Sequence, residues 1–330
     1  MSKLLKEVIF HNGLKMPIVG LGTWQSPPEQ VIAAVDTALE MGYRHIDTAF
    51  LYRNEAEIGK TLKKWFDSGK LKREDVFIVT KLPHKGNRAE SVEKYLKKSL
   101  EALQLSYVDL YLIHNPVGVQ DSDTELFPKD ESGNFLLDLN TDHVSLWKAM
   151  EKQVDLGRTR SIGLSNFNSR QIARIVKAAR IKPANLQVEL HVYFQQRELV
   201  AFCKALDITV CAYGPLGSPG LADFIKNSGN GAGMGDFPSE DPLKDPVVNR
   251  IAEKHNKTAA QVLLRHIMQR EIVVIPKSVT PSRIKENFQV FDFELTKEEM
   301  EELDSLDRRN KGRKFNRQLN HPEYPFAEPY

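Results

Sequence analysis

Short apolar runs and longer segments with helical spacing alternate along nearly the whole of this sequence. We expect strands over residues 18–22, 43–47, 76–80, 108–113, 160–164, 186–189, 209–212 and 272–275. The segments between them predict helices over residues 28–41, 55–68, 89–103, 141–156, 169–179, 196–206, 259–269 and 282–288. The strand runs are apolar without alternation, which indicates burial on both faces and hence a parallel sheet.

Eight β–α units fit a closed barrel better than a doubly wound sheet, which usually has fewer strands. We therefore predict a (β/α)8 TIM barrel, a fold of the α/β class. The length of 330 residues suits such a barrel as a single domain over residues 1–330. Ser169 is predicted to cap the fifth helix and Thr258 the seventh, because both residue types favour helix starts.

Two features lie outside the repeat. Asn12-Gly13, between apolar runs at 8–10 and 14–16, signals a β-hairpin that we expect to plug the bottom of the barrel. Segments rich in Gly, Pro, Asp or Asn are predicted to be loops; they cover residues 118–140, 216–245 and 309–330. The first two follow strands and so belong to the mouth, the end of the barrel where the carboxyl ends of the strands lie. They are candidates for setting specificity, although each also fits a surface insertion without function.

Composition limits the partners of this chain. Its 46 Lys and Arg residues against 44 Asp and Glu residues give a net charge of +2, so we expect no binding of nucleic acid or membrane surfaces. No apolar run reaches the roughly 18 residues of a membrane-spanning helix, and the first ten residues do not resemble a signal peptide. Only Cys203 and Cys211 are present, which favours the cytoplasm over an oxidising compartment. A monomer is expected by default.

Ionisable residues follow the carboxyl ends of three adjacent predicted strands. Asp47 ends the second strand and Tyr52 lies in the loop after it, while Lys81 and His114 end the third and fourth strands. Taken singly, such an aspartate is often a helix cap and such a histidine a satisfied core residue. Four of them at matched strand ends favour one functional site at the mouth.

This set suits proton transfer to a carbonyl oxygen that is becoming an alkoxide. A free tyrosine, with a pKa of about 10, is a poor proton donor near neutrality. We expect Lys81 to lower the pKa of Tyr52, and Asp47 to keep that lysine charged and in place. We expect His114 to be neutral and to orient the carbonyl oxygen with a hydrogen bond. The sequence has no His-Glu-x-x-His motif or cysteine ligand motif, so no metal site is predicted.

A proton donor without a nucleophile needs something else to attack the carbonyl carbon, and a hydride suits this role. Gly20-Leu21-Gly22 lacks the final glycine of the dinucleotide fingerprint, so a Rossmann-type site is unsupported. Lys277, Ser278 and Arg283, however, follow the eighth predicted strand at a helix start, the recurrent phosphate site of such barrels. An ordinary basic helix start is the alternative.

The sequence resembles the aldo-keto reductase family, its aldose and aldehyde reductase members above all, over nearly its full length. The matching motifs are Gly-Tyr-Arg-His-Ile-Asp-Thr-Ala at 42–49 with Tyr52, Leu-Ile-His at 112–114, Gly-Leu-Ser-Asn-Phe at 163–167, and Ile-Pro-Lys-Ser at 275–278 with Arg283, Glu286 and Asn287. The resemblance implies an enzyme that reduces aldehydes and ketones to alcohols with NADPH, a hydride coming from the nicotinamide and a proton from Tyr52.

The resemblance also assigns roles to individual residues. The implied catalytic residues are Asp47, Tyr52, Lys81 and His114. The implied cofactor-binding residues are Thr23, Trp24, Asp47, Ser165, Asn166, Gln187, Tyr213, Leu216, Ser218, Lys277, Ser278, Val279, Thr280, Arg283, Glu286 and Asn287. Among them, Ser165, Asn166 and Gln187 would bind the nicotinamide carboxamide, and Tyr213 would stack on its ring. The implied substrate-binding residues are Trp24, Tyr52, His114, Asn115 and Phe127.

The chain departs from the aldose reductases at several of these places. It has Gly214 where they have serine, and Gly220 where they have an aspartate that helps to latch a loop over the cofactor, which implies faster cofactor exchange. Pro83 and Asn115 replace two tryptophans that narrow the aldose reductase pocket. A wider or more polar pocket would suit a bulky ketone such as a 3-oxo-ecdysteroid, a substrate of some arthropod members, or a broad range of carbonyl compounds.

Two other functions are compatible with a barrel of this kind. One is a nucleotide-binding structural or sensor protein, which would keep the fold without the chemistry. The presence of all four catalytic residues argues against it. The other is a metal-dependent hydrolase or isomerase, which the absence of a metal-ligand motif disfavours.

Overall fold

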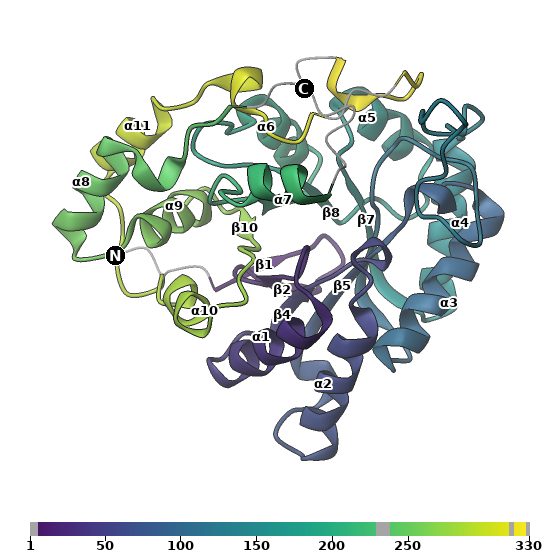
Figure 1. Cartoon of the computed structure of the whole chain (residues 1–330), viewed down its shortest axis with the longest axis horizontal. Coiled ribbons are helices and arrows are strands. Elements are labelled where there is room, and N and C mark those ends of the chain that lie inside the picture. Colours follow the sequence, from purple (N-terminus) through teal and green to yellow (C-terminus); the bar gives the residue numbers. More distant parts are fainter. Residues whose placement is uncertain (1–5, 229–237, 317–319, 328–330) are drawn as a thin grey trace.

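The structure is a computed structural model that describes residues 6–228, 238–316 and 320–327 (Figure 1). Its strands are β1 (Glu7–Ile9), β2 (Lys15–Pro17), β3 (Leu21–Gly22), β4 (His45–Asp47), β5 (Phe77–Leu82), β6 (Val108–Ile113), β7 (Thr159–Ser165), β8 (Asn185–Glu189), β9 (Thr209–Tyr213) and β10 (Val273–Val274). Its α-helices are α1 (Pro28–Glu40), α2 (Glu55–Asp67), α3 (Val92–Leu103), α4 (His143–Asp155), α5 (Ser169–Ala178), α6 (Arg197–Ala205), α7 (Leu221–Ser228), α8 (Pro246–His255), α9 (Ala259–Met268), α10 (Pro281–Phe288) and α11 (Lys297–Asp304).

The eight strands β3 to β10 form one parallel sheet in sequential order. Parallel bridges from Val19 to Val274 and from Gly22 to Lys277 join the two ends of this sheet, so it closes on itself. Helices lie around the sheet (Figure 1). The residues of β4, β5 and β6 are all buried, as expected for strands covered on both faces. The predicted (β/α)8 barrel is confirmed.

The predicted N-terminal hairpin is also present. Strands β1 and β2 are antiparallel, with Val8 opposite Met16, and Gly13 in the turn adopts a φ of 82° that glycine tolerates. The ring of Phe10, which follows β1, packs edge-on against Phe77 at 6.0 Å between centroids. Because Phe77 begins β5, this contact places the hairpin at the end of the barrel opposite to the mouth.

One of the two predicted helix caps is correct. Thr258 accepts a hydrogen bond from the Gln261 amide and donates its own amide to the Gln261 side chain, forming a capping box at the start of α9. The cap of α5, however, is Asn168 and not Ser169. Asn168 accepts from the amide of Gln171, whose side chain accepts from the Asn168 amide in return. Asparagine and serine both cap helices well. Asn168 is the cap because it lies three residues before Gln171, the spacing that a capping box requires.

Three helices were not predicted from the sequence. Helix α7 lies within the segment 216–245, so the prediction of a loop there is wrong for residues 221–228; residues 229–237 lie outside the described part. Helices α8 and α11 follow good caps, since Asp245 accepts from two amides of α8 and Thr296 forms a capping box with Glu299. These start signals were present in the sequence, so both helices could have been predicted from their caps.

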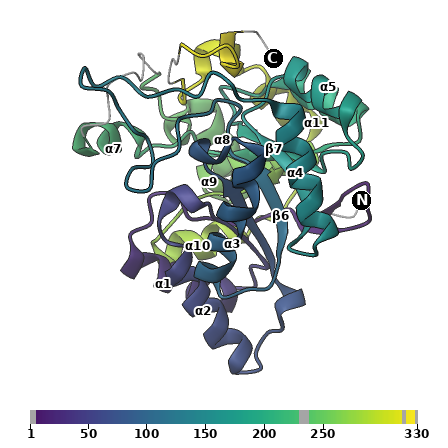
Figure 2. The ribbon, with the colours of Figure 1, turned by 90° about the vertical axis from the view of Figure 1, so that its right-hand side faces the viewer.

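The other two predicted loops have little regular structure where they are described. Residues 118–140 contain only isolated bridges, between Val119 and Leu137 and between Lys129 and Phe135. The described part of 309–330 contains short 3-10 turns at Arg309–Gly312 and Pro325–Ala327. In both ribbon views the yellow C-terminal segment lies beside α5 (Figures 1 and 2). It therefore adds no further β–α unit to the barrel.

Candidate active site

A fully buried lysine joins two of the predicted catalytic residues. The ammonium of Lys81 donates to a carboxylate oxygen of Asp47 at 2.7 Å, to the carbonyl of Thr48 at 2.8 Å and to the phenol oxygen of Tyr52 at 3.3 Å. The side chain of Lys81 is 0% exposed and that of Asp47 is 3% exposed. Since a buried charge is costly without partners, these three contacts fix the ammonium in one place beside the phenol.

His114 is the fourth predicted catalytic residue, and it contacts the ring of Tyr52. Its ring and that of Tyr52 meet edge-on, with centroids 5.7 Å apart. Burial lowers the pKa of His114 well below its usual range, and the nearby charge of Lys81 and the imidazole of His84 act in the same direction. The expectation of a neutral imidazole therefore agrees with the structure. The structure thus brings all four predicted catalytic residues together at the mouth.

The expected effect of Lys81 on the phenol is not found. Burial raises the pKa of Tyr52 well above its usual range, and the charge of Asp47 adds to this effect. The physical reason is that the positive charge of Lys81 is already balanced by Asp47, which also faces the phenol, so no net positive field favours the phenolate. Tyr52 is therefore protonated near neutrality, and its phenol oxygen accepts from the ammonium of Lys81.

The residues predicted to bind a nicotinamide carboxamide form one hydrogen-bonded group with the catalytic residues. Asn166 has a φ of 64°, donates to the carbonyl of His114 at 2.9 Å and accepts from the hydroxyl of Tyr213 at 2.8 Å. The side-chain nitrogen of Asn166 also donates to the Ser165 hydroxyl at 3.2 Å. Gln187 donates to the second carboxylate oxygen of Asp47 at 2.7 Å. The side-chain nitrogen of Gln187 is therefore already engaged in a hydrogen bond with Asp47.

The predicted phosphate residues lie after β10. Thr280 precedes α10 without capping it through its side chain, so the first amides of this helix have no side-chain acceptor. The Ser278 hydroxyl accepts from the Thr280 amide at 3.1 Å. Lys277 and Arg283 are exposed, and neither makes an ion pair with an acidic residue within the described ranges. Free amides, a hydroxyl and two cations are the donor set that a phosphate group requires.

The remaining predicted cofactor residues differ from one another in burial and in their contacts. Thr23 is buried and its hydroxyl donates to the carbonyl of Asp47 at 2.9 Å. Leu216 and Ser218 follow β9, and Ser218 has a φ of 47°. Asn287 is buried and Val279 is partly buried, whereas the carboxylate of Glu286 accepts from the hydroxyl of Thr258 at 2.8 Å. A cofactor-binding role of Glu286 would have to coexist with this internal contact.

The predicted substrate residues are Trp24, Asn115 and Phe127, besides Tyr52 and His114. Asn115 turns back on its own backbone, because its side-chain oxygen accepts from the amide of Val117 at 2.9 Å. Phe127, from the loop after β6, packs edge-on against His84 at 5.0 Å. Because the ring of His84 also lies 5.8 Å from that of His114, His84 connects Phe127 to the catalytic group.

Sequence reasoning missed His84 and two residues that bring the C-terminal segment to the mouth. Phe315 packs against Trp24 at 5.5 Å and against Tyr213 at 5.4 Å between ring centroids. Glu189, the last residue of β8, accepts from the backbone amide of Phe315 at 3.0 Å. An acidic residue at the end of a buried strand is the same signal that identified Asp47. Applied to β8, it would have singled out Glu189.

The described ranges hold neither a candidate metal centre nor a helix that could cross a membrane. No group of three or more His, Cys, Asp or Glu side chains there could hold a metal ion. None of the helices in those ranges combines the length and the apolar character needed to cross a membrane.

Comparisons with known proteins point to one family. The model of the Aldo/keto reductase family matches residues 18–308. Aldo-keto reductase family 1 member A1 from Bos taurus is 46% identical over 335 residues, covering 98% of this chain and 98% of that protein. The protein of the same name from Homo sapiens is 44% identical, with 98% of each chain covered. A solved structure of the aldose reductase from Schistosoma japonicum superimposes with a TM-score of 0.88 at 47% identity, covering 99% of this chain and 100% of that one.

Proposed function

This chain belongs to the aldo/keto reductase family, and we propose that it reduces a broad range of aldehydes and ketones to alcohols with NADPH. It is an oxidoreductase that acts on carbonyl compounds. The observation that carries the proposal is the position of the buried Lys81, whose ammonium contacts both Asp47 and Tyr52.

In the proposed mechanism, Tyr52 gives its proton to the carbonyl oxygen of the substrate. Lys81 holds the phenol oxygen in place through its hydrogen bond, which would strengthen as the proton leaves. Asp47 keeps the ammonium in position by accepting one of its hydrogen bonds. The neutral imidazole of His114, beside the phenol, would donate a hydrogen bond that orients the carbonyl oxygen.

NADPH, when bound, would supply the hydride for the carbonyl carbon. Ser165, Asn166 and Gln187 would bind its carboxamide, and Tyr213 would stack on the nicotinamide ring. The exposed cations Lys277 and Arg283 support a preference for NADPH over NADH, because the 2′-phosphate of NADPH would meet positive charge there. The other residues proposed to hold the cofactor are Thr23, Trp24, Leu216, Ser218, Ser278, Val279, Thr280, Glu286 and Asn287.

The substrate pocket is proposed to be wider than that of an aldose reductase. Its wall would contain Asn115 and Phe127, and Pro83 would stand where a bulkier side chain is found in the aldose reductases. The position of His84 between His114 and Phe127 adds a polar group to this wall. A bulky ketone such as a 3-oxo-ecdysteroid is one substrate that such a pocket would admit.

We further propose a cytoplasmic monomer that acts on small-molecule substrates. Both cysteines are buried and unpaired, which fits a reducing compartment. A structural or sensor protein on the same barrel is not favoured, because Asp47, Tyr52, Lys81 and His114 are all present and in contact range of one another.

The test is the substitution Tyr52→Phe, which removes the proposed proton donor and leaves the ring. We expect the rate of NADPH oxidation with an aromatic aldehyde to fall by about 10²- to 10⁴-fold, because general acid catalysis contributes on that order. Binding of NADPH, followed by protein fluorescence, should stay unchanged. Activity within tenfold of the parent would exclude Tyr52 as the acid. A parent protein that binds NADPH but reduces no aldehyde or ketone would favour the structural alternative instead.

A further inference from the structure

Three consecutive backbone carbonyls next to the proposed active site are each held by a side chain from a different part of the fold. The carbonyl of His114 accepts from Asn166 at 2.9 Å, and that of Asn115 accepts from Asn87 at 2.8 Å. The carbonyl of Pro116 lies 2.8 Å from Nε2 of His143, the first residue of α4. The segment 114–116 carries one proposed catalytic residue and one proposed substrate residue. These three side chains therefore determine where it lies.

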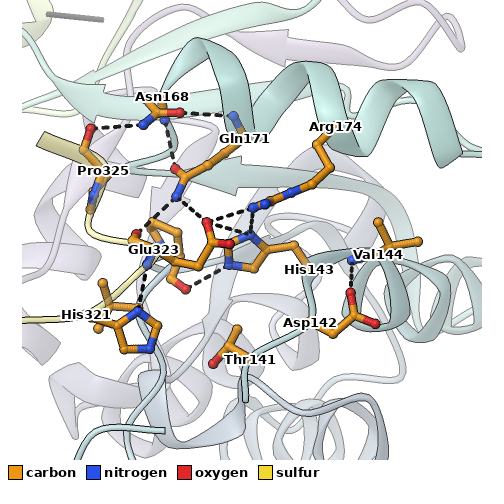
Figure 3. Close-up of polar contacts among 12 residues, drawn as sticks. Thr141, Asp142, His143, Val144, Asn168, Gln171, Arg174, His321, Glu323 and Pro325 are labelled. Carbon is orange, nitrogen blue, oxygen red and sulfur yellow. Dashed lines mark hydrogen bonds and ion pairs between the residues drawn. The ribbon is translucent and has the colours of Figure 1, made fainter. Parts of the chain in front are cut away.

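Polar contacts also connect His143 to the C-terminal segment (Figure 3). Its Nδ1 lies 2.8 Å from the guanidinium of Arg174 on α5, and that guanidinium donates to the carboxylate of Glu323 at 2.7 Å. The same carboxylate oxygen accepts from the Gln171 amide at 3.0 Å. We call Glu323, Arg174 and His143 the tail clasp.

The partners of His143 fix its protonation state. A guanidinium can only donate and a carbonyl can only accept, so Nδ1 accepts from Arg174 while Nε2 carries the hydrogen that is donated to Pro116. Burial lowers the pKa of His143, and the charges of Arg174 and His321 add to this effect, while the Pro116 carbonyl and Glu323 oppose it. The imidazole is therefore a neutral relay that receives one hydrogen bond from the tail side and gives one to the segment 114–116.

We propose that the tail clasp is a positioning device, through which Glu323 and Arg174 hold His143 so that it sets the segment His114–Pro116 for the carbonyl substrate. This proposal rests on the proposed function and names residues that act through others rather than on the substrate. It assigns a role in substrate binding to a carboxylate on the far C-terminal segment, which would touch neither the substrate nor the cofactor.

The C-terminal segment does not depend on Glu323 alone for its position. His321 Nε2 lies 2.8 Å from the carbonyl of Asp138, and Nδ1 of the same ring accepts from the amide of Glu323 at 3.0 Å. The side chain of Asn168 donates to the carbonyl of Pro325 at 3.2 Å. Because these contacts lie on both sides of Glu323, a change of its carboxylate should leave the segment docked. The effect of such a change would then report on the clasp itself.

The first test compares His143→Leu with His143→Gln. Leucine removes the donor to Pro116, whereas the amide of glutamine offers a donor and an acceptor on one planar group, as the imidazole does. We expect His143→Leu to raise the KM for an aromatic aldehyde by about two- to tenfold, the range that one lost hydrogen bond supplies, with the KM for NADPH unchanged. His143→Gln should restore the aldehyde KM to within about twofold of the parent.

A merely structural role of His143 would give a different result. His143→Leu would then lower the melting temperature but leave the aldehyde KM of the folded enzyme equal to that of the parent. That outcome would overturn the proposal. An equal rise in the KM for NADPH would also overturn it, because it would indicate a general loosening of the mouth.

The second test addresses the link to the tail. Glu323→Gln keeps the size of the side chain but weakens the attraction for Arg174, so the aldehyde KM should rise in the same direction as for His143→Leu. Glu271→Gln is the matched control, because Glu271 pairs with Lys204 through side chains that are 62% and 77% exposed. It should leave the KM unchanged. Parent-like KM values for Glu323→Gln would show that the tail does not act through His143.

A third measurement does not depend on activity. Hydrogen exchange of peptides that cover residues 114–119 should be faster in His143→Leu than in the parent, since this segment loses one of its holding side chains. If the parent reduces no carbonyl compound, the proposed function fails, yet this exchange still decides whether His143 positions the segment. Exchange at the parent rate would overturn the positioning role.

Discussion

Lys81 is the residue whose surroundings explain most about the candidate site. All three of its ammonium hydrogens have an acceptor: Asp47, the carbonyl of Thr48 and the phenol oxygen of Tyr52. Asp47 in turn accepts from both Lys81 and Gln187, one on each carboxylate oxygen. Both side chains are almost fully buried, so each charge depends on the other for its compensation.

Replacing one partner of this pair should therefore be costly. We expect Lys81→Met to lower the free energy of unfolding by about 3–5 kcal/mol, because it leaves the Asp47 carboxylate buried without its counter-charge. Urea denaturation at pH 7 measures this. The double substitution Lys81→Met with Asp47→Leu should be less destabilising than Lys81→Met alone, since it removes the stranded charge.

The control for this prediction is an exposed pair. Lys204→Met breaks the pair with Glu271 and should change the free energy of unfolding by no more than about 1 kcal/mol. A cost for Lys81→Met as small as that of Lys204→Met would mean that water or another cation compensates Asp47, contrary to the contacts described.

At the scale of elements, the helices differ in what holds them. Helix α11 buries only Glu299 and Leu303, so apolar packing contributes little to it. Its first turn is instead held by polar contacts. Thr296 and Glu299 form a capping box, and the carboxylate of Glu299 also accepts from Lys254 and His255 at the end of α8. Local hydrogen bonds thus define the helix and attach it to its neighbour.

This predicts a measurable cost of removing the cap. Thr296→Ala should destabilise the protein by about 1 kcal/mol, because the Glu299 amide loses its side-chain acceptor. Thr296→Ser retains the hydroxyl and should stay close to the parent. Both can be compared by thermal unfolding under identical conditions. Equal melting temperatures for the Ala and Ser variants would indicate that the contacts with α8 hold this helix without the cap.

At the scale of the whole molecule, closure of the barrel suggests one cooperative unit. The sheet joins β3 to β10, and the N-terminal hairpin covers the opposite end from the mouth, where Nδ1 of His45 lies 3.1 Å from the Pro17 carbonyl. Residues 1–330 are therefore proposed to form a single domain that unfolds in one transition. Separate transitions in calorimetry would contradict this.

The buried His45 links the stability of this unit to pH. Burial lowers the pKa of His45 from 6.5 to about 4. Between these two values the unfolded chain binds a proton that the folded chain does not, so acidification favours unfolding. His45 alone should remove up to about 3 kcal/mol of stability as the pH falls from 6.5 to 4.

The pH prediction is tested with His45→Asn, which can still donate to the Pro17 carbonyl but does not titrate. Urea denaturation at pH 7, 5.5 and 4 should show a smaller loss of stability on acidification in this variant than in the parent. The comparison concerns the difference between pH values, so a constant cost of the substitution does not affect it. Equal losses in the two proteins would exclude His45 as a major acid-sensitive group.

Much of this molecule follows from local sequence patterns. Apolar runs and helical spacing predicted the eight-stranded barrel, because each strand and most helices bury a continuous face that local periodicity records. The strand ends predicted Asp47, Tyr52, Lys81 and His114, because the carboxyl ends of parallel strands meet at one rim. Helices α7, α8 and α11 were missed, although the capping residues at the starts of α8 and α11 can be read in the sequence.

Only the tertiary structure decided the remaining features. The sequence identified Tyr52 and Lys81, but the direction in which the pKa of Tyr52 moves depends on burial and on the sum of nearby charges, which requires coordinates. The positions of His84 and Phe315 and the tail clasp likewise depend on contacts between segments far apart in the chain. Glu323 reaches Arg174 across 149 residues of sequence. Local patterns record which face of an element is buried, whereas electrostatics and long-range contacts are properties of the closed barrel.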